Sequence, residues 1–129
     1  MSEPLQILLV EDNPDHVFLA RREFKNSGAK VQIHHAEDSQ AALDFLANAE
    51  TLPDGILLDI KLPGRDGFEL LVLLKDDETT KEIPVILLSS SPIPSDIERA
   101  ARLGAASYFT KPVNAQMVLD ILNQESRKE

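Results

Sequence analysis

Three short runs of apolar residues stand out from the mixed hydrophobic and polar pattern of the chain. They cover residues 5–10, 55–59 and 83–88, and each ends in a polar residue or is followed by one. Uninterrupted runs of this length are typical of strands buried on both faces of a parallel sheet. Residues 31–34 and 107–109 alternate apolar and polar positions, which indicates half-buried strands. We therefore expect three central strands and two edge strands.

Five segments with apolar residues at helical spacing separate and follow these strands. They begin near residues 14, 39, 68, 95 and 114. Asn13 is the predicted N-cap of the first helix, and either Asp38 or Ser39 is predicted to cap the second. Ser95 is the predicted cap of the fourth helix. The third helix carries more leucine than one buried stripe needs, so it is either exposed to a partner in part or mostly buried under its neighbours.

The inward faces of the last two helices follow from the same spacing. In the fourth helix they should include Ile97, Ala100 and Ala101. Small contacts bury little apolar area, and this helix should therefore be the most loosely held. In the fifth helix the predicted inward residues are Met117, Val118, Ile121 and Leu122.

The alternation of strands and helices predicts an α/β fold with both faces of a five-stranded parallel sheet covered. With right-handed crossovers, the strand order is 2-1-3-4-5, a doubly wound, flavodoxin-like arrangement. A chain of 129 residues is an ordinary size for one domain. We expect residues 1–129 to form that single domain, with no output domain.

Composition narrows the function classes. Thirteen basic and 22 acidic residues give a net charge of −9, which argues against a surface for binding nucleic acid. The chain has no cysteine, and no segment approaches the roughly 20 apolar residues that span a bilayer. No signal peptide is recognisable at the start. We expect a cytoplasmic protein with neither nucleic acid nor membrane as a partner.

Charged and hydroxyl residues occur where the predicted strands end. Glu11 and Asp12 follow the first strand, Asp59 ends the third, Ser89 ends the fourth and Lys111 follows the fifth. Because the carboxyl ends of parallel strands share one rim, these side chains should gather there. Three crowded carboxylates favour a bound cation, and hard oxygen ligands favour magnesium over zinc.

Phosphoryl transfer is the chemistry that fits this set of groups. A carboxylate such as Asp59 can attack phosphorus and form an acyl phosphate. The remaining requirement is to balance charge on the phosphoryl oxygens. Besides the metal, the Lys111 ammonium and the Ser89 hydroxyl are placed to do so.

On these residues, the chain resembles the receiver domains of two-component response regulators over essentially its whole length. The resemblance implies that Asp59 accepts phosphoryl from the phosphohistidine of a sensor histidine kinase. It also implies that magnesium is held by Glu11, Asp12, Asp59 and the backbone carbonyl of Lys61. Further implications are a switch formed by Ser89 and Tyr108, a cis bond between Lys111 and Pro112, and output through the fourth helix, fifth strand and fifth helix to a partner protein or a second copy.

Two segments point to one subgroup. The opening Val-Glu-Asp-Asn-Pro and the segment Ile-Lys-Leu-Pro-Gly-Arg-Asp-Gly resemble stand-alone receivers that pair with bacterial phytochrome-type kinases. In the family, the positions of Lys61 and Ser91 flank the path of a hydrolytic water. They should therefore influence the lifetime of the acyl phosphate.

Other functions remain open at this point. A haloacid-dehalogenase-like phosphatase would need acids two residues apart after the first strand, whereas Glu11 and Asp12 are adjacent. A flavodoxin-like cofactor binder would need a phosphate loop rich in glycine and hydroxyl residues there. A degenerate receiver would bind partners without accepting phosphate. His16, His34 and His35 lack ligand spacing. We expect His34 and His35 to lie away from the acid cluster, whereas His16 falls in the first turn of the first helix. All three should be structural or solvent-exposed.

Overall fold

The computed structural model describes residues 4–62, 66–90 and 93–126. Its centre is a five-stranded parallel sheet in the order β2-β1-β3-β4-β5, as predicted. The strands are β1 (Leu5–Val10), β2 (Val31–Ala36), β3 (Gly55–Asp59), β4 (Val85–Ser89) and β5 (Ser107–Thr110). Ser91, one of the two residues expected to influence the acyl phosphate, lies outside the described residues.

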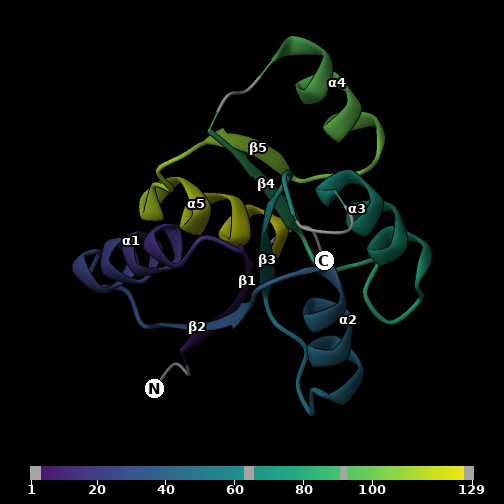
Figure 1. The fold of residues 1–129 in the computed structure, drawn as a ribbon. Coiled ribbons are helices and arrows are strands. Elements are labelled where there is room, and N and C mark those ends of the chain that lie inside the picture. Colours follow the sequence, from purple (N-terminus) through teal and green to yellow (C-terminus); the bar gives the residue numbers. More distant parts are fainter. Residues whose placement is uncertain (1–3, 63–65, 91–92, 127–129) are drawn as a thin grey trace.

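Helices cover both faces of the sheet. They are α1 (Pro14–Asn26), α2 (Ser39–Asn48), α3 (Gly67–Asp76), α4 (Pro94–Arg102) and α5 (Ala115–Ser126). Figure 1 shows α1 and α5 on one face and α2, α3 and α4 on the other. Each face has its own hydrophobic core, because the side chains of a strand alternate between the two sides. Among the described residues, no helix combines the length and the apolar composition needed to cross a bilayer.

The division into central and edge strands is also confirmed. Every residue of β3 and β4 is buried, whereas β2 and β5 are mostly half-buried. A strand with neighbours on both sides and helices on both faces has no surface left for water. The two edge strands each have a neighbour on one side only, so part of their surface faces water and can carry polar side chains.

Side chains cap the starts of four of the described helices, and at α5 the cap is Asn114, which accepts from the Met117 amide. Asn13 accepts a hydrogen bond from the Asp15 amide, and Asp38 accepts one from Ala41. Asp66 caps α3 in the same way. The prediction of Ser95 as the cap of α4 is wrong, because α4 already begins at Pro94 after the N-cap residue Ile93. Proline lacks an amide hydrogen and has a helical φ, so it is well suited to the first helical position.

The predicted inward faces of α4 and α5 are partly wrong. In α4 only Ala100 is buried, while Ile97 is 47% exposed and Ala101 is also exposed. The helix thus contacts the fold along a narrower stripe than its spacing suggested. In α5, Val118 and Leu122 are buried as expected and Ile121 is half-buried, but Met117 is 47% exposed.

Helix α3 is partly buried and partly exposed, so each of the two predictions made for its leucine-rich sequence holds for some of its residues. Leu70, Leu71 and Leu74 are buried. Val72 and Leu73 are 39% and 42% exposed. The helix therefore buries a wide face and leaves two apolar side chains at the surface.

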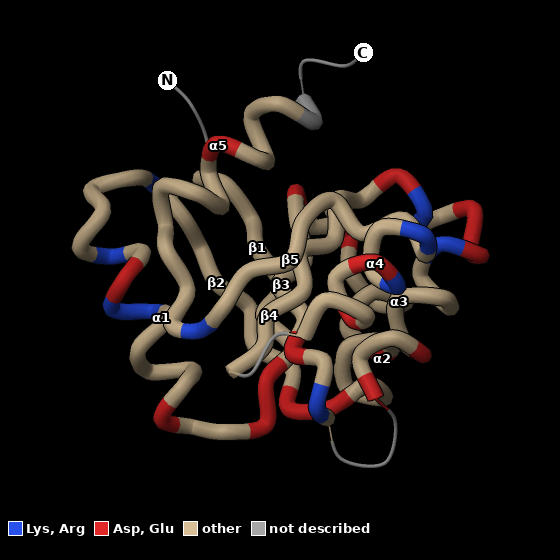
Figure 2. Tube along the Cα trace, turned by 90° about the horizontal axis from the view of Figure 1, so that it is seen from above, with Lys and Arg blue, Asp and Glu red and all other residues tan. Residues whose placement is uncertain are grey.

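Charged residues are spread around the fold. Figure 2 shows the basic residues in separate short segments between acidic ones, over the described part of the chain. The chain as a whole carries a net charge of −9.

Candidate functional site

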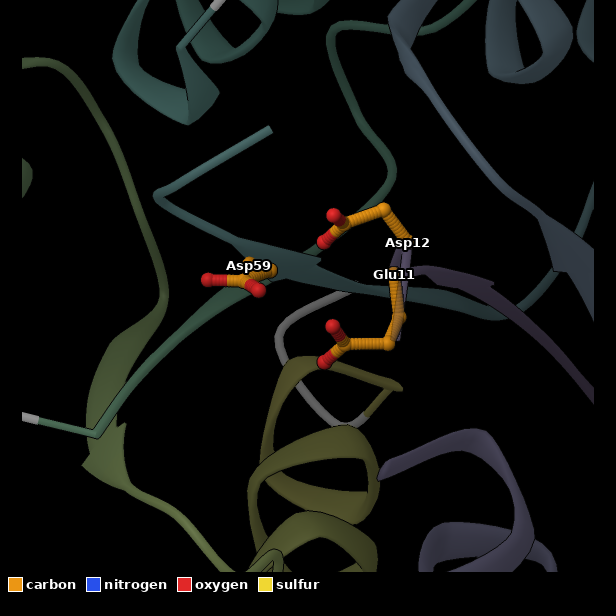
Figure 3. A group of neighbouring side chains, drawn as sticks. All are labelled: Glu11, Asp12 and Asp59. Carbon is orange, nitrogen blue, oxygen red and sulfur yellow. The ribbon is translucent and has the colours of Figure 1, made fainter. Parts of the chain in front are cut away.

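Three carboxylates meet at the carboxyl ends of two neighbouring strands. Glu11 and Asp12 directly follow β1, Asp59 is the last residue of β3, and these two strands pair side by side. One oxygen of each acid lies within 4.8 Å of the others. Figure 3 shows the carboxylates of Glu11 and Asp12 both turned toward Asp59. The structure thus brings together the acids that the sequence predicted.

These acids differ in their exposure. Glu11 and Asp59 are only 2% and 7% exposed, whereas Asp12 is exposed. Burial raises the pKa of Glu11 because the charged form loses its hydration, and the nearby Asp59 raises it further. A hydrogen bond from Lys111 acts in the opposite direction but does not cancel these effects. The site is therefore a concentration of negative charge that a cation would relieve.

Lys111 supplies one positive charge to this cluster. Its Nζ lies 2.5 Å from Oε1 of Glu11 and 2.9 Å from Oδ2 of Asp59. Burial alone would lower the pKa of Lys111, but the hydrogen bonds to the two acids raise it above its ordinary value. The group is therefore an ammonium at neutral pH and is held directly beside Asp59.

The backbone around Lys111 is tied to the end of β4. The Lys111 amide donates to the carbonyl of Ser89 at 2.8 Å, and the Lys111–Pro112 bond is cis, as the resemblance implied. Ser89 is 2% exposed and stands one position beyond the β4 residue that pairs with Asp59. The predicted hydroxyl position is thus at the rim of the site.

The loop after β3 fixes the other side of Asp59. Its Oδ1 accepts a hydrogen bond from the Lys61 amide at 3.0 Å, so both carboxylate oxygens have donors. Gly67, at the start of α3, donates to the carbonyl of Ile60 at 2.8 Å. A Cβ on Gly67 would lie 2.5 Å from the carbonyl oxygen of Asp59, so only glycine lets the helix come this close. The role of the Lys61 carbonyl in metal binding stays a prediction.

Tyr108 occupies a half-buried position in β5 and packs against the core under α2, α3 and α4. Its hydroxyl is buried, and no described residue supplies it with a hydrogen-bond partner. A polar group in this position lowers the stability of the fold. Its role as a switch stays a prediction.

Two histidines reach the site, although the sequence predicted only structural or solvent-exposed roles for them. The His16 Nδ1 lies 2.9 Å from the Nζ of Lys111, and the His35 Nε2 lies 2.7 Å from the backbone oxygen of Glu11. The expectation that His35 sits away from the acids is therefore wrong. His16 follows Asp12 by four residues, but its contact with Lys111 depends on how α1 packs beside the end of β5. His35 pairs with the strand position two before Glu11, so its contact depends on the pairing of β1 and β2.

The donor set fits a divalent cation of the magnesium type. Glu11, Asp12 and Asp59 offer hard carboxylate oxygens, which Mg²⁺ prefers over softer ligands. Beside them, the Lys111 ammonium can pair with an anion that approaches Asp59. The arrangement therefore suits a nucleophilic carboxylate that reacts with an anionic group.

Comparison with known sequences gives a consistent result. The profile of the response regulator receiver domain matches residues 7–123. FilR2, a probable methanogenesis regulatory protein of Methanothrix harundinacea, is 39% identical over 117 residues, which cover 88% of this chain and 76% of FilR2. The response regulator PleD of Caulobacter vibrioides is 37% identical over 113 residues, which cover 88% of this chain but only 24% of PleD.

Solved structures with the same fold include regulators of phytochromes. The phosphorylated cyanobacterial phytochrome response regulator RcpA is 35% identical, with a TM-score of 0.77 and coverage of 94% of this chain and 90% of RcpA. The bacteriophytochrome response regulator AtBRR is 31% identical, with a TM-score of 0.84 and coverage of 97% and 94%. The Mn²⁺-bound form of response regulator Rcp1 is 31% identical, with a TM-score of 0.77 and coverage of 96% and 91%.

Proposed function

This chain belongs to the response regulator receiver domain family, and we propose that it accepts a phosphoryl group on Asp59 from a sensor histidine kinase. One observation carries the proposal: a nearly buried carboxylate, Asp59, has two acids on one side and the Lys111 ammonium 2.9 Å from its Oδ2. Receiver domains are in general signalling domains rather than enzymes. The reaction proposed here modifies the chain itself.

The proposed transfer breaks one bond and forms another. A carboxylate oxygen of Asp59 attacks phosphorus, and the new C–O–P linkage is a mixed anhydride. The P–N bond of the kinase phosphohistidine breaks, and its electron pair returns to the imidazole nitrogen. Lys111 balances charge on a phosphoryl oxygen, and Ser89 donates a hydrogen bond to another.

Mg²⁺ is the proposed cofactor. Its ligands would come from Glu11, Asp12, Asp59 and the backbone carbonyl of Lys61. When bound, the ion neutralises charge on the phosphoryl oxygens and on the acids. Glu11, Asp12 and Asp59 lie close enough together to share one ion. The similar regulator Rcp1 has been solved with Mn²⁺.

The signal is proposed to leave through the surface of α4, β5 and α5. Movement of Ser89 toward the phosphoryl group would make room for Tyr108, a shift between two states that new charge-assisted hydrogen bonds would bias. The recipient would be a partner protein or a second copy of the chain. Similarity to RcpA and AtBRR supports a phytochrome-type kinase as the phosphodonor. The cytoplasmic location and the lack of nucleic-acid or membrane partners stay predictions.

Incubation with acetyl phosphate and magnesium tests the proposal. Intact-protein mass spectrometry should show one added phosphoryl group. This group should not be added when magnesium is left out, and it should be absent in Asp59→Asn. The matched control is Asp76→Asn, which changes an exposed acid at the end of α3 and should retain phosphorylation.

Two results would contradict the proposal. No uptake by the wild-type chain would favour a degenerate receiver that acts by binding alone. Catalytic hydrolysis of a small phosphoester, with repeated turnover, would favour a phosphatase of the haloacid dehalogenase type.

A further inference from the structure

The ammonium of Lys111 has three acceptors around it. Besides Glu11 Oε1 at 2.5 Å and Asp59 Oδ2 at 2.9 Å, the Nδ1 of His16 lies at 2.9 Å. A lysine ammonium has three N–H donors and no acceptor, so these three contacts use all of its hydrogen-bonding capacity. His16 therefore completes the environment of the only cation within hydrogen-bond reach of Asp59 among the described residues.

The contact determines the form of the imidazole. Because the ammonium only donates, Nδ1 of His16 must accept, and the ring proton lies on Nε2. The ring is therefore neutral in this arrangement. A third carboxylate in its place would add negative charge where an anionic phosphoryl group has to approach, whereas a neutral acceptor holds the ammonium without that repulsion.

The surroundings of Lys111 explain why a third contact is needed. A cavity of about 280 Å³ opens beside the site, lined by Glu11, His16, Leu19, Leu88 and Lys111, among others. A lysine side chain has a flexible stem and could turn into such a space. His16, in the first turn of α1, lines this cavity and also contacts the ammonium.

We infer that His16 is a positioning residue for phosphoryl transfer, which acts by holding the Lys111 ammonium against Glu11 and Asp59. The inference rests on the proposed function of Asp59. It assigns His16 no contact with the phosphoryl group. Its effect on the reaction should pass entirely through Lys111.

Two variants separate this role from general packing. In His16→Asn, the side-chain Oδ1 takes the place of Nδ1 and keeps a neutral acceptor. In His16→Leu, the volume is similar but the acceptor is lost. The rate of phosphorylation by acetyl phosphate should fall about threefold to tenfold in His16→Leu, the effect of one hydrogen bond, and should return close to the wild-type rate in His16→Asn.

A second measurement does not depend on phosphorylation. An ammonium held by three acceptors exchanges its protons slowly, and the ¹H–¹⁵N signal of the Lys111 Nζ should be visible by NMR in the wild-type chain. That signal should broaden or vanish in His16→Leu and reappear in His16→Asn. Lack of phosphoryl uptake by the wild-type chain would defeat the proposed function, but the ammonium signal would still test the position of Lys111.

A double-mutant cycle completes the test. In a Lys111→Met background, His16→Leu should have no further effect on the phosphorylation rate, since the residue it acts through is gone. A full effect of His16→Leu in that background would overturn the inference. So would equal loss of rate, or of the ammonium signal, in the Asn and Leu variants.

Discussion

The Nζ of Lys111 lies 2.9 Å from Oδ2 of Asp59, although the two residues are 52 positions apart in the sequence. Lys111 follows the edge strand β5, and Asp59 ends β3, so the lysine reaches across the end of β4, which lies between them. Its long side chain also contacts Glu11 after β1. One cation thereby connects the ends of strands from both halves of the sheet.

Removal of this cation should slow the chemistry. We expect Lys111→Met to lower the rate of Asp59 phosphorylation by acetyl phosphate at least about tenfold, because a phosphoryl oxygen loses its charge partner. The measurement is the initial rate of phosphoprotein formation by mass spectrometry. Lys81→Met is the matched control, since Lys81 pairs with Glu78 at the exposed end of the loop after α3. An unchanged rate in Lys111→Met would contradict the proposed role.

The raised pKa of Lys111 predicts a contribution to stability that depends on pH. A cation whose pKa is higher in the folded chain stabilises the fold fully below its ordinary value of 10.5, and this contribution is lost as the pH rises through the folded-state pKa. The difference in unfolding free energy between wild type and Lys111→Met should therefore be constant from neutral pH to about 10.5 and shrink above it. Urea unfolding at several pH values measures it. A difference that instead rose with pH below about 10.5 and levelled off above it would show that folding lowers the pKa of Lys111.

Asp12 should matter for metal binding and little for folding. Its side chain is exposed but shares the cluster with two acids. We expect Asp12→Asn to weaken Mn²⁺ or Mg²⁺ binding at least about tenfold in calorimetry. The melting temperature without metal should stay the same or rise slightly, because one of three repelling charges is gone. Asp15→Asn, at an exposed position in the first turn of α1, is the control that should keep its affinity.

Gly67 should be required for both stability and reactivity. A Cβ there would meet the backbone of Asp59 and Ile60 at 2.5 and 2.6 Å, so Gly67→Ala must displace the loop that fixes Asp59. We expect a loss of about 1–3 kcal/mol in unfolding free energy and a slower phosphorylation. Gly55→Ala is a matched control, since its Cβ would meet the side-chain end of Leu122 at 2.6 Å. It should lower stability without slowing the reaction.

The buried hydroxyl of Tyr108 predicts a stabilising substitution. Because no described residue satisfies this hydroxyl, Tyr108→Phe should raise the unfolding free energy of the unphosphorylated chain by about 1 kcal/mol. Denaturant unfolding checks the change. A loss of stability would mean that the hydroxyl makes a favourable interaction in solution.

The histidines show where sequence reasoning was limited. A single histidine in the first turn of a helix carries no periodic signal, so its ordinary interpretation was structural. His16 acquired a different meaning only when α1 packed beside the β5 end and brought Lys111 within 2.9 Å. His35 similarly reaches the backbone of Glu11 because β2 pairs with β1 in one particular register.

Surface exposure was the other limit. Spacing correctly identified the buried Val118 and Leu122 in α5, but it also placed Met117 inward, where the structure shows it 47% exposed. The predicted cap of α4 was wrong because two neighbouring residues satisfy the local rules for a helix start: Ser95 suits the N-cap position, and Pro94 suits the first helical position. Such choices depend on how far the neighbouring elements extend.

The sequence by itself determined the strand order, the central and edge strands, and the rim on which Glu11, Asp12, Asp59, Ser89 and Lys111 gather. These features follow from local hydrophobic patterns and from the single direction of parallel strands, which the chain encodes residue by residue. Only the tertiary structure decided that Glu11 is buried, that His16 is a third acceptor for Lys111, and that Gly67 approaches Asp59 so closely. These depend on how closely segments remote in sequence pack against one another, which no local pattern contains.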